Sequence, residues 1–318
     1  MIYIEMNGRL GNQMFRYAFG RWLQYKAGRA GKSSRNALVL DFSNIEMESK
    51  RSSMPGWEDS LAHFRTAPYT RWNGKGSPLR RAASLPEQAV LGLIWAGDRF
   101  FGRGDTVKRL RWRKKFLPWL NRHGLYILFV GYDYDFTLSR KRDKFVNGPF
   151  ECARYCEEIR PLLLKEFRPK YPTAEKNAAL MEQITSVNSV CVTIRRGNYL
   201  EYPMLDVCGA DYFERAMAEM KKLVEDPVFF LFSDDVDWVK ENVRVPGKAV
   251  YESGDDPVWE KLRLMYSCRH FIISNSTFSW WAQFLGDAKD KVVIAPDHWF
   301  NAAYQPPLAQ KNWIRVKA

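Results

Sequence analysis

The sequence predicts an α/β protein with two domains, of which the second carries a parallel sheet. Its 318 residues are enough for two domains with separate cores. Residues 1–28 follow the pattern of a strand, a glycine-containing turn and a helix. After residue 173, runs rich in β-branched and aromatic residues alternate regularly with amphipathic segments. Such alternation is typical of parallel strands joined by helical crossovers, so the second half is expected to be Rossmann-like.

The first half is expected to open on a glycine-containing turn that matches no standard motif. Tyr3 and Ile4 fit a buried strand, and Gly8 and Gly11 permit a tight turn in which backbone N–H groups can approach a ligand. The turn is not G-x-G-x-x-G, and the run AGRAGKS at 27–33 is not a P-loop, because Lys26 stands where the first glycine is required. The other elements expected here are strands at 37–42 and 125–130 and a mainly helical stretch at 148–167.

Residues 43–121 lack a clear period and are expected to form a basic, irregular insert in the first domain. Within it, residues 99–115 hold eight Lys and Arg with interleaved aromatic residues. This composition suits nucleic acid or anionic lipid headgroups, and a solvated basic face is an equally open alternative. In the lipid interpretation, Trp112, Phe116 and Trp119 are the aromatic residues that accompany the charge.

Pro169 and Pro172 mark the expected domain boundary, which gives domains at 1–170 and 171–318. The elements expected after it are helices at 174–187, 211–224, 238–242, 257–267 and 278–285 and strands at 190–194, 228–232, 249–251, 271–274 and 292–295. The helix at 211–224 is expected to begin with a capping box between Asp211 and Glu214.

The composition narrows the class of partner. A net charge of +13 in a chain with 46% hydrophobic residues indicates a folded protein with an anionic partner. Five cysteines and four histidines show no metal-ligand spacing, so no metal site is expected. Residues 1–10 include Glu5 and Arg9, unlike a signal peptide, and no run of about 18 apolar residues occurs. We therefore expect a cytoplasmic protein, with peripheral contact at the inner face of a membrane left open.

Polar and basic side chains follow three predicted strands of the second half. They are Arg195 and Arg196, then Asp234 and Asp235, then Asn275, Ser276 and Thr277 just before a helix at Phe278. Ligands of open α/β sheets bind at the carboxyl ends of strands, guanidinium grips phosphate, and free N–H groups at a helix start attract anions. A carboxylate also matches the N1–H and N2 amine of guanine. A nucleoside diphosphate site is predicted, although each residue alone could be a strand end or an N-cap.

Five segments resemble the α-1,2-fucosyltransferase family of inverting enzymes that use GDP-fucose, in the family's order across nearly the whole chain. The segments are GRLGNQMFRYAFG at 8–20, VTIRRGNY at 192–199, FFLFSDDVDWVKEN at 229–242, LMYSCRHFIISNSTFSWWAQFL at 264–285 and KNWIRV at 311–316. Residues 43–121 do not contribute to it. The resemblance implies two facing Rossmann-like domains of the GT-B type, no cofactor and no metal, and a galactose-containing glycan as acceptor, lipid-linked or free.

The resemblance also implies roles for individual residues. Arg195 would neutralise the leaving diphosphate, and Asn12 would reach the phosphate and glycosidic oxygen. Asp234 or Asp235 would recognise guanine. The full donor-binding set implied by the resemblance is Arg9, Gly11, Asn12, Arg195, Arg196, Gly197, Asp234, Asp235, Asn275, Ser276, Thr277 and Phe278, with Arg195 and Asn12 catalytic. Of the two arginines, Arg196 is expected to be the one buried in a structural salt bridge.

The sequence departs from the family pattern in three places. The common HxRRGDY has Thr193 and Asn198 in place of His and Asp, DLxLM has Lys261 in place of its acid, and the segment at 131–136 is unlike its family counterpart. A carboxamide cannot act as a base near neutral pH, so either another carboxylate serves or the residue at 198 only orients its neighbours.

Three alternative functions stay open at this point. A nucleic-acid-binding protein would explain the basic segment but not the strand-end motifs, and no nucleic acid is expected. A transferase of another linkage or another GDP-sugar would share every donor motif. A relative that binds GDP-fucose without transferring it would explain the missing acid at position 198.

Overall fold

The computed structural model describes residues 1–29, 36–52, 55–79, 83–101, 106–128 and 136–318. They divide into two compact units: unit 1 contains Met1–Ala62 and Thr66–Glu166, and unit 2 contains His63–Arg65 and Phe167–Ala318. The short excursion at His63–Arg65 belongs to unit 2 because Phe64 forms an antiparallel bridge with Pro169 and packs edge-on against Phe167.

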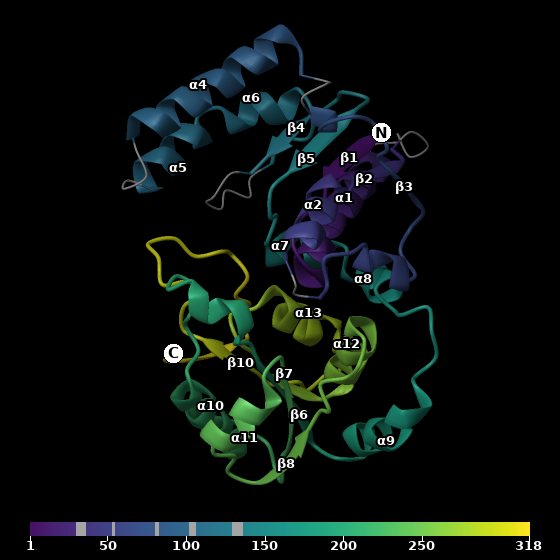
Figure 1. Ribbon diagram of the computed structural model, residues 1–318, viewed down its shortest axis with the longest axis vertical. Coiled ribbons are helices and arrows are strands. Elements are labelled where there is room, and N and C mark those ends of the chain that lie inside the picture. Colours follow the sequence, from purple (N-terminus) through teal and green to yellow (C-terminus); the bar gives the residue numbers. More distant parts are fainter. Residues whose placement is uncertain (30–35, 53–54, 80–82, 102–105, 129–135) are drawn as a thin grey trace. The chain divides into compact units, whose positions relative to one another are not determined.

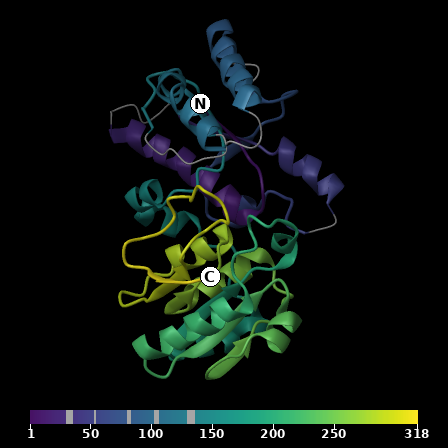
Figure 2. The ribbon, with the colours of Figure 1, turned by 90° about the vertical axis from the view of Figure 1, so that its left-hand side faces the viewer.

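Unit 1 is built on a five-stranded sheet in the order β3-β2-β1-β5-β4, in which every pair is parallel. Its elements are β1 (Ile2–Glu5), α1 (Leu10–Arg29), β2 (Leu38–Asp41), α2 (Ser43–Arg51), η2 (Ser60–His63), β3 (Tyr69–Arg71), α4 (Leu85–Phe101), α5 (Thr106–Lys114), α6 (Leu117–Arg122), β4 (Leu125–Ile127), β5 (Lys144–Asn147), α7 (Ala153–Glu158) and α8 (Arg160–Glu166). The long purple helix α1 accompanies the sheet in both views (Figures 1 and 2).

The expectation of an irregular insert at 43–121 is wrong, because the described part of this segment is largely helical. The apolar side of α4 packs through Ile94 on Leu120 of α6 and on Leu125 and Ile127 of β4. The helix is hard to recognise from the sequence because its remaining surface is also largely apolar, which hides the helical period. Residues 129–130 of the predicted strand and 131–135 of the unusual family segment lie outside the described residues.

Unit 2 carries a six-stranded parallel sheet in the order β11-β10-β9-β6-β7-β8. Its elements are η3 (Glu175–Asn177), α9 (Ala178–Ser186), β6 (Ser189–Ile194), η4 (Gly197–Glu201), α10 (Ala210–Leu223), β7 (Val228–Ser233), α11 (Val236–Asn242), β8 (Lys248–Tyr251), α12 (Val258–Ser267), β9 (His270–Ile272), α13 (Thr277–Leu285), β10 (Val293–Pro296) and β11 (Ile314–Val316). The predicted α/β class and parallel sheet are confirmed. The chain runs outward from β6 to β8, then restarts at β9 on the other side of β6, which is the doubly wound order of dinucleotide-binding folds.

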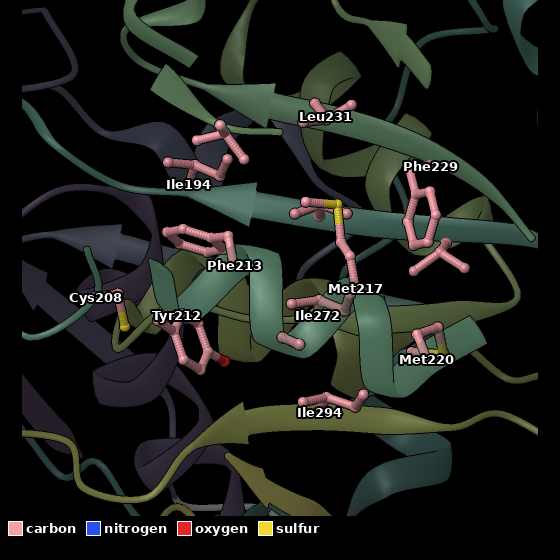
Figure 3. Close-up of a cluster of buried hydrophobic side chains, with 14 of the residues drawn as sticks. Ile194, Cys208, Tyr212, Phe213, Met217, Met220, Phe229, Leu231, Ile272 and Ile294 are labelled. Carbon is pink, nitrogen blue, oxygen red and sulfur yellow. The ribbon is translucent and has the colours of Figure 1, made fainter. Parts of the chain in front are cut away.

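The core of unit 2 forms between its sheet and α10 (Figure 3). Tyr212, Phe213, Met217 and Met220 are fully buried and lie on one face of the helix. The predicted capping box is wrong. Gly209 is the N-cap, whereas Asp211 already lies inside the first turn and pairs with Arg215 at 2.8 Å.

Within the described residues, no helix combines the length and apolar content that crossing a bilayer requires.

Candidate functional site

The topological switch point of unit 2 lies between β6 and β9, which pair directly. Arg195 follows β6, and Asn275 follows β9 after a short connection. Asp234 follows β7, the other neighbour of β6. The structure therefore brings all three predicted strand-end groups to one edge of one sheet, where doubly wound folds bind nucleotides.

Arg195 is held on two sides by oxygen acceptors. One terminal nitrogen of its guanidinium forms an ion pair with Asp234 Oδ2 at 2.6 Å, and the other donates to Asn198 Oδ1 at 2.6 Å. The guanidinium carbon also lies 5.4 Å from the centroid of the Tyr199 ring. The side chain keeps 21% of its surface exposed, so it is fixed in direction and still accessible.

Arg196 lies differently, with its guanidinium carbon 3.3 Å from the centroid of the Trp238 ring. Its backbone N–H donates to Asp234 Oδ1 at 2.9 Å, while its side chain stays 3.7 Å from Asp235. Arg196 thus forms an ion pair with Asp235, as expected, but this pair is longer than the one that Arg195 forms with Asp234. Stacking on the indole ring of Trp238 also holds Arg196.

The two acidic residues after β7 have separate structural roles. Asp234 pairs with the Arg195 guanidinium through Oδ2 and accepts from the Arg196 N–H through Oδ1. Asp235 caps α11 by accepting from the Trp238 N–H at 3.1 Å. Gly197 closes the cluster at a φ of +28°, where a Cβ would come within 2.4 Å of Asp234 Oδ2. A side chain at position 197 would displace the carboxylate that holds Arg195.

In the Asn-Ser-Thr segment at 275–277, the first two side chains make hydrogen bonds that stabilise the fold. Asn275 is buried and its amide donates to the carbonyls of Leu205 and Trp299 at 2.9 and 3.0 Å, so it joins two loops. Ser276 caps α13 by accepting from the Phe278 N–H at 3.3 Å. Thr277 and Phe278 are half-buried in the first turn of this helix, and their backbone lies at its positive end.

In unit 1, the residues predicted to bind the donor lie in the turn from β1 into α1. Gly8 has a φ of +75°, and a Cβ there would lie 2.4 Å from Asn12 Nδ2, so the turn needs glycine. The N–H of Asn12 donates to the Arg9 carbonyl at 3.0 Å, and Gly11 is buried beside it. Gln13 anchors the turn from within, because its buried amide donates to the carbonyls of Gly8 and Glu58 at 3.1 and 2.8 Å.

The orienting role left open for residue 198 agrees with the structure, because Asn198 Oδ1 accepts from Arg195. One pair of polar groups at a strand end was missed in the sequence. Asp297 and His298 follow β10, and the two side chains lie 2.7 Å apart. Burial is the largest influence and favours the neutral acid, but the hydrogen bonds from His298 and the Ala318 N–H, with the charge of His298, together outweigh it and lower the pKa of Asp297. The strand-end rule used for β6, β7 and β9 would have found this pair.

Among the residues that the structure describes, no group of three or more His, Cys, Asp and Glu side chains is arranged to hold a metal ion. The positive charge at the switch point comes from Arg195 and Arg196. A guanidinium with fixed geometry, together with the positive end of α13, suits an anionic group such as a diphosphate.

Comparison with known proteins gives a consistent set of relatives. The family described as glycosyl transferase family 11 matches residues 107–317. The O-antigen biosynthesis glycosyltransferase WbnK of Escherichia coli is 29% identical, over 99% of this chain and 100% of its own length. The human galactoside alpha-(1,2)-fucosyltransferase 1 is 31% identical over 56% of this chain and 54% of its own length. An Escherichia coli alpha-1,2-colitosyltransferase is 29% identical over 54% of this chain and 61% of its own length. A solved structure of the NodZ alpha-1,6-fucosyltransferase soaked with GDP-fucose aligns over 89% of this chain and 91% of its own, with 15% sequence identity and a TM-score of 0.47.

Proposed function

The chain belongs to glycosyl transferase family 11, and we propose that it transfers L-fucose from GDP-fucose to the 2-hydroxyl of a galactose-containing glycan, with inversion and without a metal. The observation that carries this proposal is the Arg195 cluster at the switch point of unit 2. There, a guanidinium held at two atoms faces the edge where a doubly wound sheet receives a nucleotide.

The donor chemistry follows from the charge that develops in the reaction. The acceptor oxygen attacks the anomeric carbon while the bond from that carbon to the β-phosphate oxygen breaks. The electron pair of the broken bond stays on the departing GDP, and the anomeric configuration inverts. Arg195 stabilises the growing negative charge on the diphosphate, and the positive end of α13 at Thr277 and Phe278 adds to this stabilisation.

Asp234 and Asn198 act on Arg195 and not on the sugar in this scheme. They hold the guanidinium in one orientation, so that it need not reorganise as the leaving group becomes charged. Asn198 keeps the length and one acceptor oxygen of the family's aspartate, which is what this orienting role requires. Guanine recognition by Asp234 or Asp235, and contact of Asn12 with the phosphate, stay predictions from the family resemblance.

The proposed function is tested by incubating the full chain with GDP-fucose and a panel of β-galactosides, followed by linkage analysis of the product. An α-1,2-linked fucose on galactose supports the proposal. Release of GDP at the rate of hydrolysis alone with every acceptor, or a different linkage, contradicts it. Arg195→Ala, assayed in parallel, distinguishes transfer at this site from a contaminating activity.

A second donor has a specific observation in its favour. One of the relatives is an alpha-1,2-colitosyltransferase, at nearly the same identity as the relative that matches over full length. Colitose and fucose donors share the diphosphate that the Arg195 cluster would bind, so this cluster does not discriminate between them. Direct competition between the two donors in one reaction, with products separated by mass, decides which sugar is preferred.

A further inference from the structure

The outer side of α4 carries large apolar side chains that no described part of the protein covers. Leu85, Leu93, Trp95 and Phe100 are 81%, 54%, 66% and 84% exposed. Leu85, Ala89, Leu93, Ala96 and Phe100 follow one another at steps of four, four, three and four residues, and all are exposed. These steps place the five on one helix face, here called the apolar stripe.

The inner side of the same helix is already packed against other elements of unit 1. Ile94 is buried in a cluster with residues of α6 and β4, and Val90 and Leu91 pack against that cluster. The apolar stripe is therefore the second apolar face of α4, beyond the one the fold uses. Among the described elements of unit 1, no other helix or strand runs along the outer side of α4 in either view (Figures 1 and 2). Soluble proteins rarely leave such a contiguous apolar surface without a partner.

The aromatic residues of the neighbouring basic segment do not form this surface. Trp112 packs edge-on against Phe101 and Phe116, and Phe116 and Trp119 pack against the Ile94 cluster. Trp112, Phe116 and Trp119, which were expected to accompany the basic charge at a lipid surface, are half-buried in contacts within unit 1 and so offer less surface than expected. The exposed apolar side chains come from α4 instead.

The charges around the apolar stripe have one sign. The two acids of α4 are engaged by the protein: Glu87 is buried and accepts from the Ser84 N–H at 2.7 Å, and Asp98 pairs with Arg113 at 2.6 Å. The adjoining helix α5 and the residue after it expose basic side chains, among them Arg111 and Lys115. Residues 85–115 contain eight Lys and Arg against three Asp and Glu.

We propose that the apolar stripe and the basic side of α5 together dock the protein on an anionic lipid bilayer. Apolar and aromatic side chains of an interfacial helix enter the boundary between headgroups and acyl chains, and the neighbouring Lys and Arg attract anionic lipids. A second copy of the chain is the poorer occupant, because pairing the same surface on itself would bring two strongly basic segments together. This inference does not depend on which sugar is transferred.

Co-sedimentation of the full chain with vesicles tests the docking surface. Vesicles of phosphatidylcholine alone are compared with vesicles containing about 30% phosphatidylglycerol, each at low and high salt. We expect binding to the anionic vesicles only, weakened by salt because the Debye length falls to about 3 Å at 1 M. Equal sedimentation with both vesicle types, or none with either, overturns the proposal.

Two variants separate the apolar and the charged parts. Replacing Leu85, Leu93 and Phe100 by serine should lower partitioning at least tenfold, since the apolar contribution is lost while the charge stays. Arg111→Gln combined with Lys115→Gln should lower it about 25-fold, at about fivefold for each charge removed. Either variant binding anionic vesicles like the wild type contradicts the assignment of this surface.

Matched controls lie elsewhere on the molecule. Leu138→Ser removes a side chain that is 47% exposed outside α4, and Lys289→Gln with Lys311→Gln removes two exposed charges from loops of unit 2. Both controls should sediment like the wild type, and thermal melts of all variants establish that the fold is intact. Sedimentation velocity measures the oligomeric state and so tests whether a second copy covers the stripe instead of lipid. A wild-type dimer that the serine variant abolishes, without vesicle binding, would assign the stripe to a second copy.

Discussion

Arg195 is the residue on which the donor chemistry depends, and its two short contacts give it a defined direction. We predict that Arg195→Ala lowers kcat/KM at least a hundredfold, about 2.7 kcal/mol, while the protein stays folded. Lysine should rescue poorly, because a single ammonium cannot reach Asp234, Asn198 and a phosphate as a fork does. Steady-state kinetics with Arg215→Ala as an exposed control measures this. Near-normal turnover of the alanine variant would reduce Arg195 to a structural residue.

Asn198 provides a sharper test of the orienting role. Since aspartate has the same length and also accepts from Arg195, we predict that Asn198→Asp changes kcat by less than about tenfold, roughly 1.4 kcal/mol. Asn198→Ala, which removes the acceptor, should lower kcat more than the aspartate variant does. A full pH–rate profile accompanies each variant. A hundredfold rise in kcat with a new acidic limb in Asn198→Asp would show that the family's aspartate is a base that this chain lacks.

His270 links the stability of unit 2 to pH. Its ring is buried, its Nδ1 accepts from the Val292 N–H at 3.1 Å, and burial lowers its pKa against the opposing charge of Asp290. In the unfolded chain His270 takes up a proton near pH 6.5, whereas in the folded chain it stays neutral at that pH. The stability of the fold therefore decreases as the pH drops below that value.

Denaturation curves between pH 7.5 and 5.5 measure the effect. His270→Asn keeps an acceptor near the Nδ1 position and removes the titration, so the variant should lose less stability on acidification than the wild type. The difference should approach about 1 kcal/mol, because each pH unit contributes at most about 1.4 kcal/mol for one proton. Parallel pH profiles for the two proteins would contradict the assignment.

At the scale of the element, α10 packs on the sheet of unit 2 and forms its hydrophobic core with it (Figure 3). Phe213 is fully buried against this sheet, so Phe213→Ala should lower the free energy of unfolding by about 3–5 kcal/mol. Arg215→Ala on the exposed side of the same helix should stay within about 0.5 kcal/mol. Urea denaturation compares the two. Equal losses would mean that α10 is not packed as described.

The elements of unit 2 were predictable because their burial follows the sequence pattern. β6 and β7 are fully buried runs, and both appear within one residue of their predicted ends. β5 was missed because its four residues include Lys144 and Asn147, which interrupt the apolar pattern. α4 was missed because both of its faces are apolar, and the second face is the one proposed to meet lipid.

The site was predictable at the level of strand ends but not of individual contacts. That Arg195, Asp234 and Asn275 gather at one edge follows from parallel strands and chain order. That Asp234 holds both arginines, or that Asn275 turns away to join two loops, depends on the local path of the backbone around Gly197 and after β9. No periodicity in the sequence encodes such a path.

For the molecule as a whole, Arg195 and the positive end of α13 take the place of a metal ion at the diphosphate in the proposed reaction. We therefore predict that transfer continues in excess EDTA at no less than about half its rate in untreated enzyme. The reason is that the charge of the leaving group is neutralised by a guanidinium that chelation does not remove. Loss of most activity in EDTA, restored by added manganese, would contradict metal independence and leave the family assignment intact.

The central claim is fucosyl transfer at the Arg195 cluster, and one measurement tests it most directly. The full chain is incubated with GDP-fucose carrying a labelled sugar and a β-galactoside, and the label is followed into product for the wild type and for Arg195→Ala. The account predicts an α-1,2-linked product from the wild type and at least a hundredfold less from the variant. Equal product from both proteins, or none from the wild type with any β-galactoside, would contradict it.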